Sequence, residues 1–196
     1  TIQFKIKKNN FTNFYELIKK ILTQNTNNFT IKGKTIIGLN DLIKKEPLSY
    51  RKADALFQYL FLQIKDLHKN NLGILYFDLS DIYFIEVSDD EFYFLLLKTD
   101  KIQKIKDNHL EILEILPKKS SLFFSPELKS AKSFPKKINF KTIYYSLALI
   151  ILFSLKKIKN TIDIENHIES LQETPLYWAL QRCLTKDVKN RTLLYI

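Results

Sequence analysis

Short alternating and helical patterns of apolar residues fill the first part of the chain. Residues 1–7 alternate polar and apolar side chains, which predicts a β-strand, and residues 11–22 place Phe14, Ile18 and Leu22 at helical spacing. The next predicted elements are a turn at 25–28, a hairpin over 29–37 with its bend at 32–34, and a short helix over 39–45. A small mixed front is therefore expected before the rest of the fold.

The longest amphipathic pattern begins after Pro47. Ser49 is a suitable N-cap residue, because its hydroxyl oxygen can accept a hydrogen bond from an amide of the first helical turn. An apolar stripe with helical spacing then runs toward His68 and consists of Ala53, Leu56, Leu60, Ile64 and Leu67. These positions predict one long helix with a single buried face.

The pattern changes to short β-rich runs after Gly73. These runs lie at residues 74–77, 82–87 and 92–97. Asp89 and Asp90 make the turn between the last two. Residues 98–119 mix charged side chains with Ile and Leu without a sustained period, so a long irregular segment is expected there.

Helical patterns return in the last third of the chain. Residues 142–155 are apolar on every side, which predicts a buried central helix, and residues 176–184 predict a last helix. The apolar run is interrupted by Ser146 and Ser154 and is shorter than the roughly 18 residues of a membrane span, so no span is expected. The order of elements predicts an α+β fold that is mostly helical.

Composition points to an ordinary compact protein. The chain has 196 residues, of which 45% are hydrophobic, enough to form a core, and its three Gly and five Pro leave little material for linkers. Because Cys183 is the only cysteine, no internal disulfide can form, and an intracellular, cytoplasmic location is expected. The chain begins at Thr1 and has no Met, so a missing upstream region is also expected.

The formal net charge of +10 allows two interpretations. Lysines gathered on one face would bind phosphates by displacing counterions, as in a basic nucleic-acid-associated structural protein. The lysines are instead scattered as pairs along the chain, which favours solvated faces. Nucleic acid stays open as an alternative partner.

The C-terminal segment carries a family resemblance. Residues 180–191 resemble the closing signature of protein kinases, in which a helix ending in Cys-Leu or Met-Leu precedes Asp-Pro-x-x-Arg. Asp187 and Arg191 keep that spacing, with Val188 in place of the proline. Ser125-Pro126-Glu127 stands where kinases have Ala-Pro-Glu. The resemblance implies a structural ion pair between Arg191 and Glu127, because a buried guanidinium needs a bidentate carboxylate partner.

Other segments resemble kinase motifs in the right order. Residues 145–152 are similar to the central helix, residues 38–43 to the short helix after the hinge, and residues 64–68 to the end of the helix before the catalytic loop. The catalytic loop itself would be residues 76–83, where only Asp78 and Leu79 match. The resemblance implies a kinase C-terminal-lobe-like domain over residues 39–196, with residues 1–38 as the remnant of a reduced or truncated N-terminal lobe.

The departures from the kinase pattern predict that catalysis has been lost. Tyr83 occupies the position of the metal-binding Asn, Phe77 that of the catalytic-loop Arg, and no Asp-Phe-Gly follows residues 92–97, where Asp100 stands nearby. The glycines are not spaced for a phosphate loop. No nucleotide or metal cofactor is therefore expected, and Asp78 is interpreted as vestigial.

Other chemistry is not indicated by the remaining polar residues. His68, His109 and His167 are far apart without ligand spacing, which argues against a metal site, and Ser125 and Cys183 lack an evident base. Lys5 or Lys7 with Glu16 would mimic the kinase Lys–Glu pair, but an amphipathic strand beside an amphipathic helix explains them equally well.

The sequence thus predicts a non-catalytic, pseudokinase-like protein-interaction module or a structural subunit of a larger assembly. The layout also resembles the kinase non-catalytic C-lobe domain, which implies a protein partner whose peptide docks beside residues 98–119. Two alternatives stay open, namely an atypical phosphotransferase that uses Asp78 and a basic nucleic-acid-associated protein.

Overall fold

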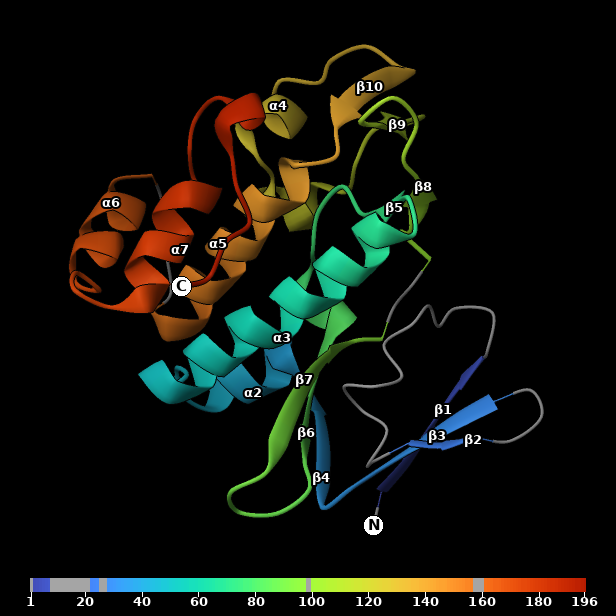
Figure 1. Ribbon diagram of the computed structural model, residues 1–196, viewed down its shortest axis with the longest axis vertical. Coiled ribbons are helices and arrows are strands. Elements are labelled where there is room, and N and C mark those ends of the chain that lie inside the picture. The colour runs from blue at the N-terminus through green and yellow to red at the C-terminus, as the bar shows by residue number, and fades with distance from the viewer. Residues whose placement is uncertain (1, 8–21, 25–27, 98–99, 157–160) are drawn as a thin grey trace.

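The computed structural model describes residues 2–7, 22–24, 28–97, 100–156 and 161–196 (Figure 1). They form an α+β fold with small antiparallel sheets and more residues in helices than in strands. This confirms the predicted class. The division at residue 38 stays a prediction.

Two three-stranded antiparallel sheets form the N-terminal half of the described chain. One contains β1 (Ile2–Lys7), β3 (Asn28–Gly33) and β2 (Leu22–Gln24) in that order, and the other contains β4 (Thr35–Gly38), β6 (Ile82–Glu86) and β7 (Phe92–Leu96). Strands β6 and β7 confirm the hairpin predicted around the turn at Asp89 and Asp90.

The hairpin predicted over residues 29–37 is wrong. Strands β3 and β4 do not pair with each other, because β3 pairs with β1 and β2 whereas β4 pairs with β6. The backbone amide of Lys34 donates to the carbonyl of Glu86 at the junction. A Cβ atom on Gly33 would lie 3.0 Å from the same carbonyl oxygen, so the crossing leaves little room for a side chain. Long-range pairing therefore replaces the local turn.

Helix α3 (Tyr50–Lys69) covers one face of the β4–β6–β7 sheet. Its N-cap is Ser49, whose Oγ accepts from the amide of Lys52 at 3.4 Å, and the predicted apolar stripe is buried along its whole length. Gln63 of this helix donates to the carbonyl of Phe94 and accepts from the amide of Leu96. These two bonds satisfy backbone groups of β7, one of the two edge strands of its sheet.

The opposite face of the same sheet packs against β3. Ile31 joins a cluster with Ile85, Tyr93, Leu95 and Leu97, while the alternating neighbours of these strand residues face α3. The short helix α2 (Leu39–Lys45) follows β4 directly and confirms the predicted helix.

Helix α5 (Thr142–Leu155) runs through the centre of the helical part, as predicted (Figure 1). It packs against α3, α6 (Thr161–Glu169) and α7 (Pro175–Cys183). Helix α7 confirms the last predicted helix, and α6 lies in a segment for which the sequence pattern made no prediction. Because neighbours surround it, α5 buries apolar side chains on all sides.

Residues 98–119 are more regular than predicted. They contain β8 (Gln103–Lys104), which pairs with β5 (Leu72–Gly73), and β9 (His109–Ile112), which pairs with β10 (Lys136–Asn139). A 3-10 helix, η3 (Lys118–Phe123), and helix α4 (Pro126–Lys129) follow. These strands are short and pair with distant segments, so no local period in the sequence predicts them.

Residues 74–77 are buried but do not form the predicted strand. They run without regular secondary structure, with a bend at Leu75, into the 3-10 helix η2 (Leu79–Asp81). Of the other predictions, the helix over 11–22 lies outside the described residues except for Leu22, which begins β2, and the turn at 25–28 lies outside them except for Asn28. Within the described part of the chain, no helix is long and apolar enough to cross a membrane.

Candidate functional site

The segment that resembles a catalytic loop is anchored on the central helix. At and just before its start, the side chains of Ile74, Leu75, Tyr76 and Phe77 are all buried. The backbone amide of Phe77 donates to Ser146 Oγ of α5 at 2.9 Å, and both groups are buried. This bond supplies the partner that a strand neighbour would otherwise give.

Asp78 and Asp81 form a reciprocal cap around η2. Asp78 Oδ1 accepts from the amide of Ser80 at 3.2 Å, and Asp81 Oδ2 accepts from the amide of Asp78 at 2.8 Å. Asp78 is half-buried, whereas Asp81 is 2% exposed. Both carboxylates therefore bind their own loop, as a capping box does at the start of a helix.

Lys101 completes this cluster from the other side. Its Nζ lies 2.5 Å from Asp81 Oδ2 and 4.4 Å from the centre of the Tyr76 ring. Burial raises the pKa of Asp81, and the hydrogen bond and charge of Lys101 oppose that rise. Sequence reasoning selected Asp78 and missed Asp81 and Lys101, since the pairing joins positions 20 residues apart.

The residues that stand at the kinase metal-binding and phosphate-binding positions lie in a strand, in the core or at the surface. Tyr83 is within β6 and pairs with Gly38 and Leu95, and Phe77 is 1% exposed. Asp100 is exposed at the surface. Lys5 and Lys7 lie in β1, while Glu16 is outside the described residues, so their proposed pairing is not tested.

Arg191 and Glu127 are joined as the resemblance implies. Arg191 Nη1 donates to Glu127 Oε1 at 2.5 Å and Nη2 donates to Oε2 at 3.0 Å. The guanidinium also donates to the carbonyls of Thr185 and Lys186 and lies 4.9 Å from the centre of the Tyr145 ring. A fully buried cation is thereby surrounded by acceptors and by the face of an aromatic ring.

The electrostatics of Glu127 follow from this pairing. Burial by itself would raise the pKa of Glu127, but the hydrogen bonds and charge of Arg191 outweigh burial and hold the pKa below its usual value. Ser125 begins α4 as its N-cap and shares a buried hydrogen bond of 2.6 Å with Thr142 of α5. The Ser125–Thr142 bond therefore joins α4 to the central helix, and the Arg191–Glu127 pair joins the C-terminal segment to α4.

Asp187 has a local role in the structure. Its carboxylate accepts from the amide of Lys189 at 3.0 Å and from the side-chain amide of Asn190, which caps η4 (Val188–Asn190). Val188, which replaces the expected proline, begins this 3-10 turn. The turn places Arg191 directly after it, facing Glu127.

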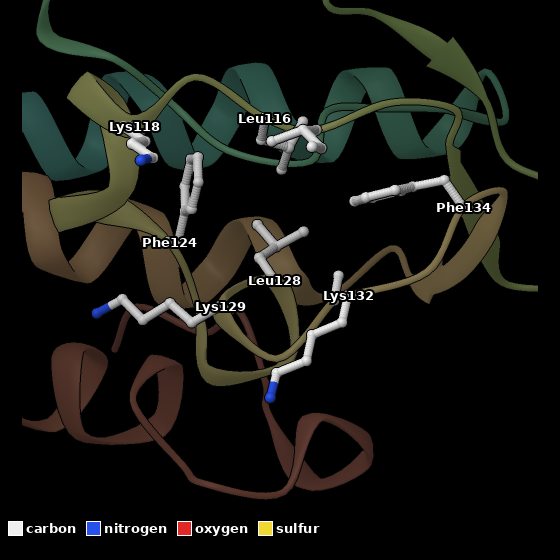
Figure 2. A pocket seen from close by; sticks show the side chains of 9 residues that line it. Leu116, Lys118, Phe124, Leu128, Lys129, Lys132 and Phe134 are labelled. Carbon is white, nitrogen blue, oxygen red and sulfur yellow. The ribbon is translucent and has the colours of Figure 1, made fainter.

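A pocket of about 390 Å³ opens next to α4 (Figure 2). Leu116, Phe124, Leu128 and Phe134 form its apolar walls, and three lysines stand around it, namely Lys118, Lys129 and Lys132. Sequence reasoning did not find this pocket, although all of its lining residues lie between positions 115 and 134, because no sequence pattern shows how this stretch folds back on itself. The local signal was the apolar-rich stretch over residues 110–116, which is interrupted by Glu111 and Glu114.

The described residues contain no cluster of metal ligands, and Cys183 is buried among them. Nowhere in this part of the chain do three His, Cys, Asp or Glu side chains gather as a metal site would require. His68 packs against Phe140 and Tyr144, and burial lowers its pKa to about 4. Cys183 is fully buried, and burial raises the pKa of its thiol to about 12, which suppresses the reactive thiolate.

Comparison with known proteins adds no family assignment. No model of a protein family matches the chain, and no curated protein matches it. The α+β class is therefore established from the structure, and the kinase resemblance stays a hypothesis based on the motif residues.

Proposed function

We propose that this chain is a non-catalytic protein-interaction module, a pseudokinase-like structural subunit of a larger assembly. The observation that supports the proposal most directly is the state of the loop around Asp78. Its two carboxylates hold backbone amides of the loop itself, and Asp81 is also paired with Lys101. Phosphoryl transfer depends on carboxylates and cations aimed at metal and phosphate, and these groups are engaged with each other.

A second feature supports an interaction role. Leu113 and Ile115 are 71% and 78% exposed, beside the pocket next to α4. Apolar side chains grouped on a protein surface commonly mark a contact with another protein. The preserved Arg191–Glu127 pair fits a scaffold, since it stabilises the lobe without taking part in chemistry.

The proposal is tested by thermal unfolding with increasing ATP and Mg²⁺. A ligand that binds the folded state raises the unfolding midpoint with its concentration, and we expect no such rise. Asp78→Asn is the informative variant, since Asn also caps helices well, and Asp187→Asn is its control, because Asp187 caps η4 in the same way. Stabilisation by ATP that Asp78→Asn removes and Asp187→Asn keeps would support a phosphotransferase instead.

The partner class is tested by size-exclusion chromatography of the protein isolated from its own cells. We expect a second polypeptide to elute with the chain after nuclease treatment. Co-elution of nucleic acid that moderate salt removes would favour the nucleic-acid-associated alternative, since phosphate contacts weaken steeply with salt.

A further inference from the structure

The pocket next to α4 is an opening in an established apolar cluster. Phe124 and Leu128 are 6% and 3% exposed and pack with buried residues of β9 and β10, while Leu116 and Phe134 are only partly buried against the same cluster. Figure 2 shows these four side chains directed toward one central space. A volume of about 390 Å³ lies within the roughly 300–1,000 Å³ range of binding pockets.

Exposed apolar side chains extend the surface beyond the pocket. Ile115 lines it directly, and Leu113 lies two residues before, each with most of its surface open to solvent. Together with the pocket they offer apolar area that burial against a partner would remove from water, at about 25 cal/mol per Å². The described chain does not cover this surface.

The charged residues that line the pocket have one sign. Lys118, Lys129 and Lys132 line it, and none of its lining residues is acidic. In the described part of the chain, no carboxylate lies within ion-pair distance of these three ammonium groups. Figure 2 places the ammonium ends of Lys129 and Lys132 away from the central space, at the border of the pocket.

The side chain of Lys129 is exposed, but partial burial still lowers the pKa of its ammonium group, and a carboxylate beside it would favour the charged form. The surface therefore combines an apolar centre with a cationic border, the usual arrangement of a contact that excludes water at its middle.

We propose that this pocket binds an acidic peptide segment of a partner protein, with a large apolar side chain in the pocket and carboxylates at Lys118, Lys129 and Lys132. The inference rests on the proposed function, because it names the partner of an interaction module. A nucleic acid is the less favoured occupant, since stacking on bases needs open aromatic faces, and of the two aromatic lining residues Phe124 is almost wholly buried and Phe134 is only partly open.

The test uses random short peptides displayed on yeast, selected for binding to the purified chain. We expect the enriched peptides to carry net negative charge and at least one large apolar residue. Their affinity should fall by about tenfold or more in Lys129→Glu/Lys132→Glu, and it should weaken with salt. Lys45→Glu/Lys156→Glu is the matched control, because it reverses the same number of exposed lysines outside the pocket.

A second pair of variants tests the apolar contact. Ile115→Ser should weaken the selected peptides, whereas Ile196→Ser, which changes a residue of nearly equal exposure at the C-terminus, should not. Both isoleucines are open to solvent, so neither change is expected to unfold the protein, and melting temperatures check this.

The outcomes separate this inference from the proposed function. Failure to enrich peptides, enrichment of neutral or basic peptides, or binding that ignores both pocket variants overturns the inference. A single-stranded oligonucleotide that depends on the pocket lysines but not on Ile115 overturns it in favour of phosphate binding. A native polypeptide partner that still binds the pocket variants overturns only the inference, whereas ATP-dependent stabilisation that requires Asp78 overturns the proposed function.

Discussion

Arg191 donates to both carboxylate oxygens of Glu127 across 64 residues of sequence, from a side chain with no exposed surface. Glu127 lies in α4 and Arg191 directly follows η4, so one ion pair connects two short elements that bury little apolar surface of their own. The desolvation of a buried cation is costly, and the surrounding carbonyls and carboxylate offset that cost only while all of them are present.

Removal of one partner of this pair should be strongly destabilising. Glu127→Ala leaves the Arg191 charge buried without a counter-ion, and we expect the free energy of unfolding to fall by about 3 kcal/mol or more. Urea denaturation measures the change, with an unchanged slope showing that the denatured state is the same. In the exposed Lys34–Asp89 pair, Asp89→Ala should cost far less, because water screens both charges.

A double-mutant cycle tests whether the two side chains act together. Glu127→Ala/Arg191→Met should lose less stability than the sum of the single changes, because the second substitution removes the unpaired charge. Simple additivity would show that the buried pair is not coupled.

Acid should weaken the protein through Glu127. Its folded-state pKa is lowered from the usual 4.5, so the unfolded chain takes up the proton more readily. The stabilisation is complete above pH 4.5 and is lost as pH falls through the lower folded-state value. Unfolding free energies measured against pH should decline less steeply in Glu127→Gln, and identical slopes in both proteins would contradict the assignment.

Lys101→Met should destabilise the protein in a pH-dependent manner. The raised pKa of Asp81 means that its ionisation in the folded state is unfavourable. This penalty is present at neutral pH, shrinks once pH falls below the raised folded-state pKa and is gone below the ordinary value of 3.8. Loss of Lys101 should enlarge this penalty by about 1–3 kcal/mol at neutral pH. In acid, the same substitution should change the free energy of unfolding less. Denaturation at several pH values measures it.

Asp81→Asn provides the control for that change. In the Lys101→Met background the amide oxygen still accepts from the amide of Asp78, but the buried charge is gone, so stability should recover at neutral pH. Equal destabilisation at every pH, with no recovery in the double variant, would show that Lys101 acts through packing.

Two serines of α5, Ser146 and Ser154, should differ in how much their hydroxyl groups stabilise the protein. Ser146→Ala leaves the buried amide of Phe77 without its partner and should cost about 1–3 kcal/mol. Ser154→Ala removes a bond of 2.7 Å to the carbonyl of Ile150 in its own helix, and a change within roughly 0.5 kcal/mol is expected since such back-bonding slightly disfavours helices. Thermal unfolding of both variants compares them, and an equal loss would show that the link to Phe77 adds nothing.

The sequence by itself determined the elements whose residues carry a local pattern. The stripe from Ala53 to Leu67 specifies α3, because its spacing leaves one face to bury, and Ser49 marks where the helix begins. The run of α5, interrupted only by Ser146 and Ser154, is apolar on every side, which specified a buried central helix. The motif comparison also selected Glu127 and Arg191 and implied their ion pair, which is present in the structure.

Only the tertiary structure decided the pairings between distant segments. Strand β4 joins β6 instead of folding back on β3, β8 and β9 find partners far along the chain, and Lys101 meets Asp81 in the interior. The pocket beside α4 lies within one stretch, residues 115–134, but only the folding of that stretch brings its lining side chains together. Short strands and single ion pairs leave no period in a sequence, because the interactions that stabilise them come from whichever segment the packed core brings alongside.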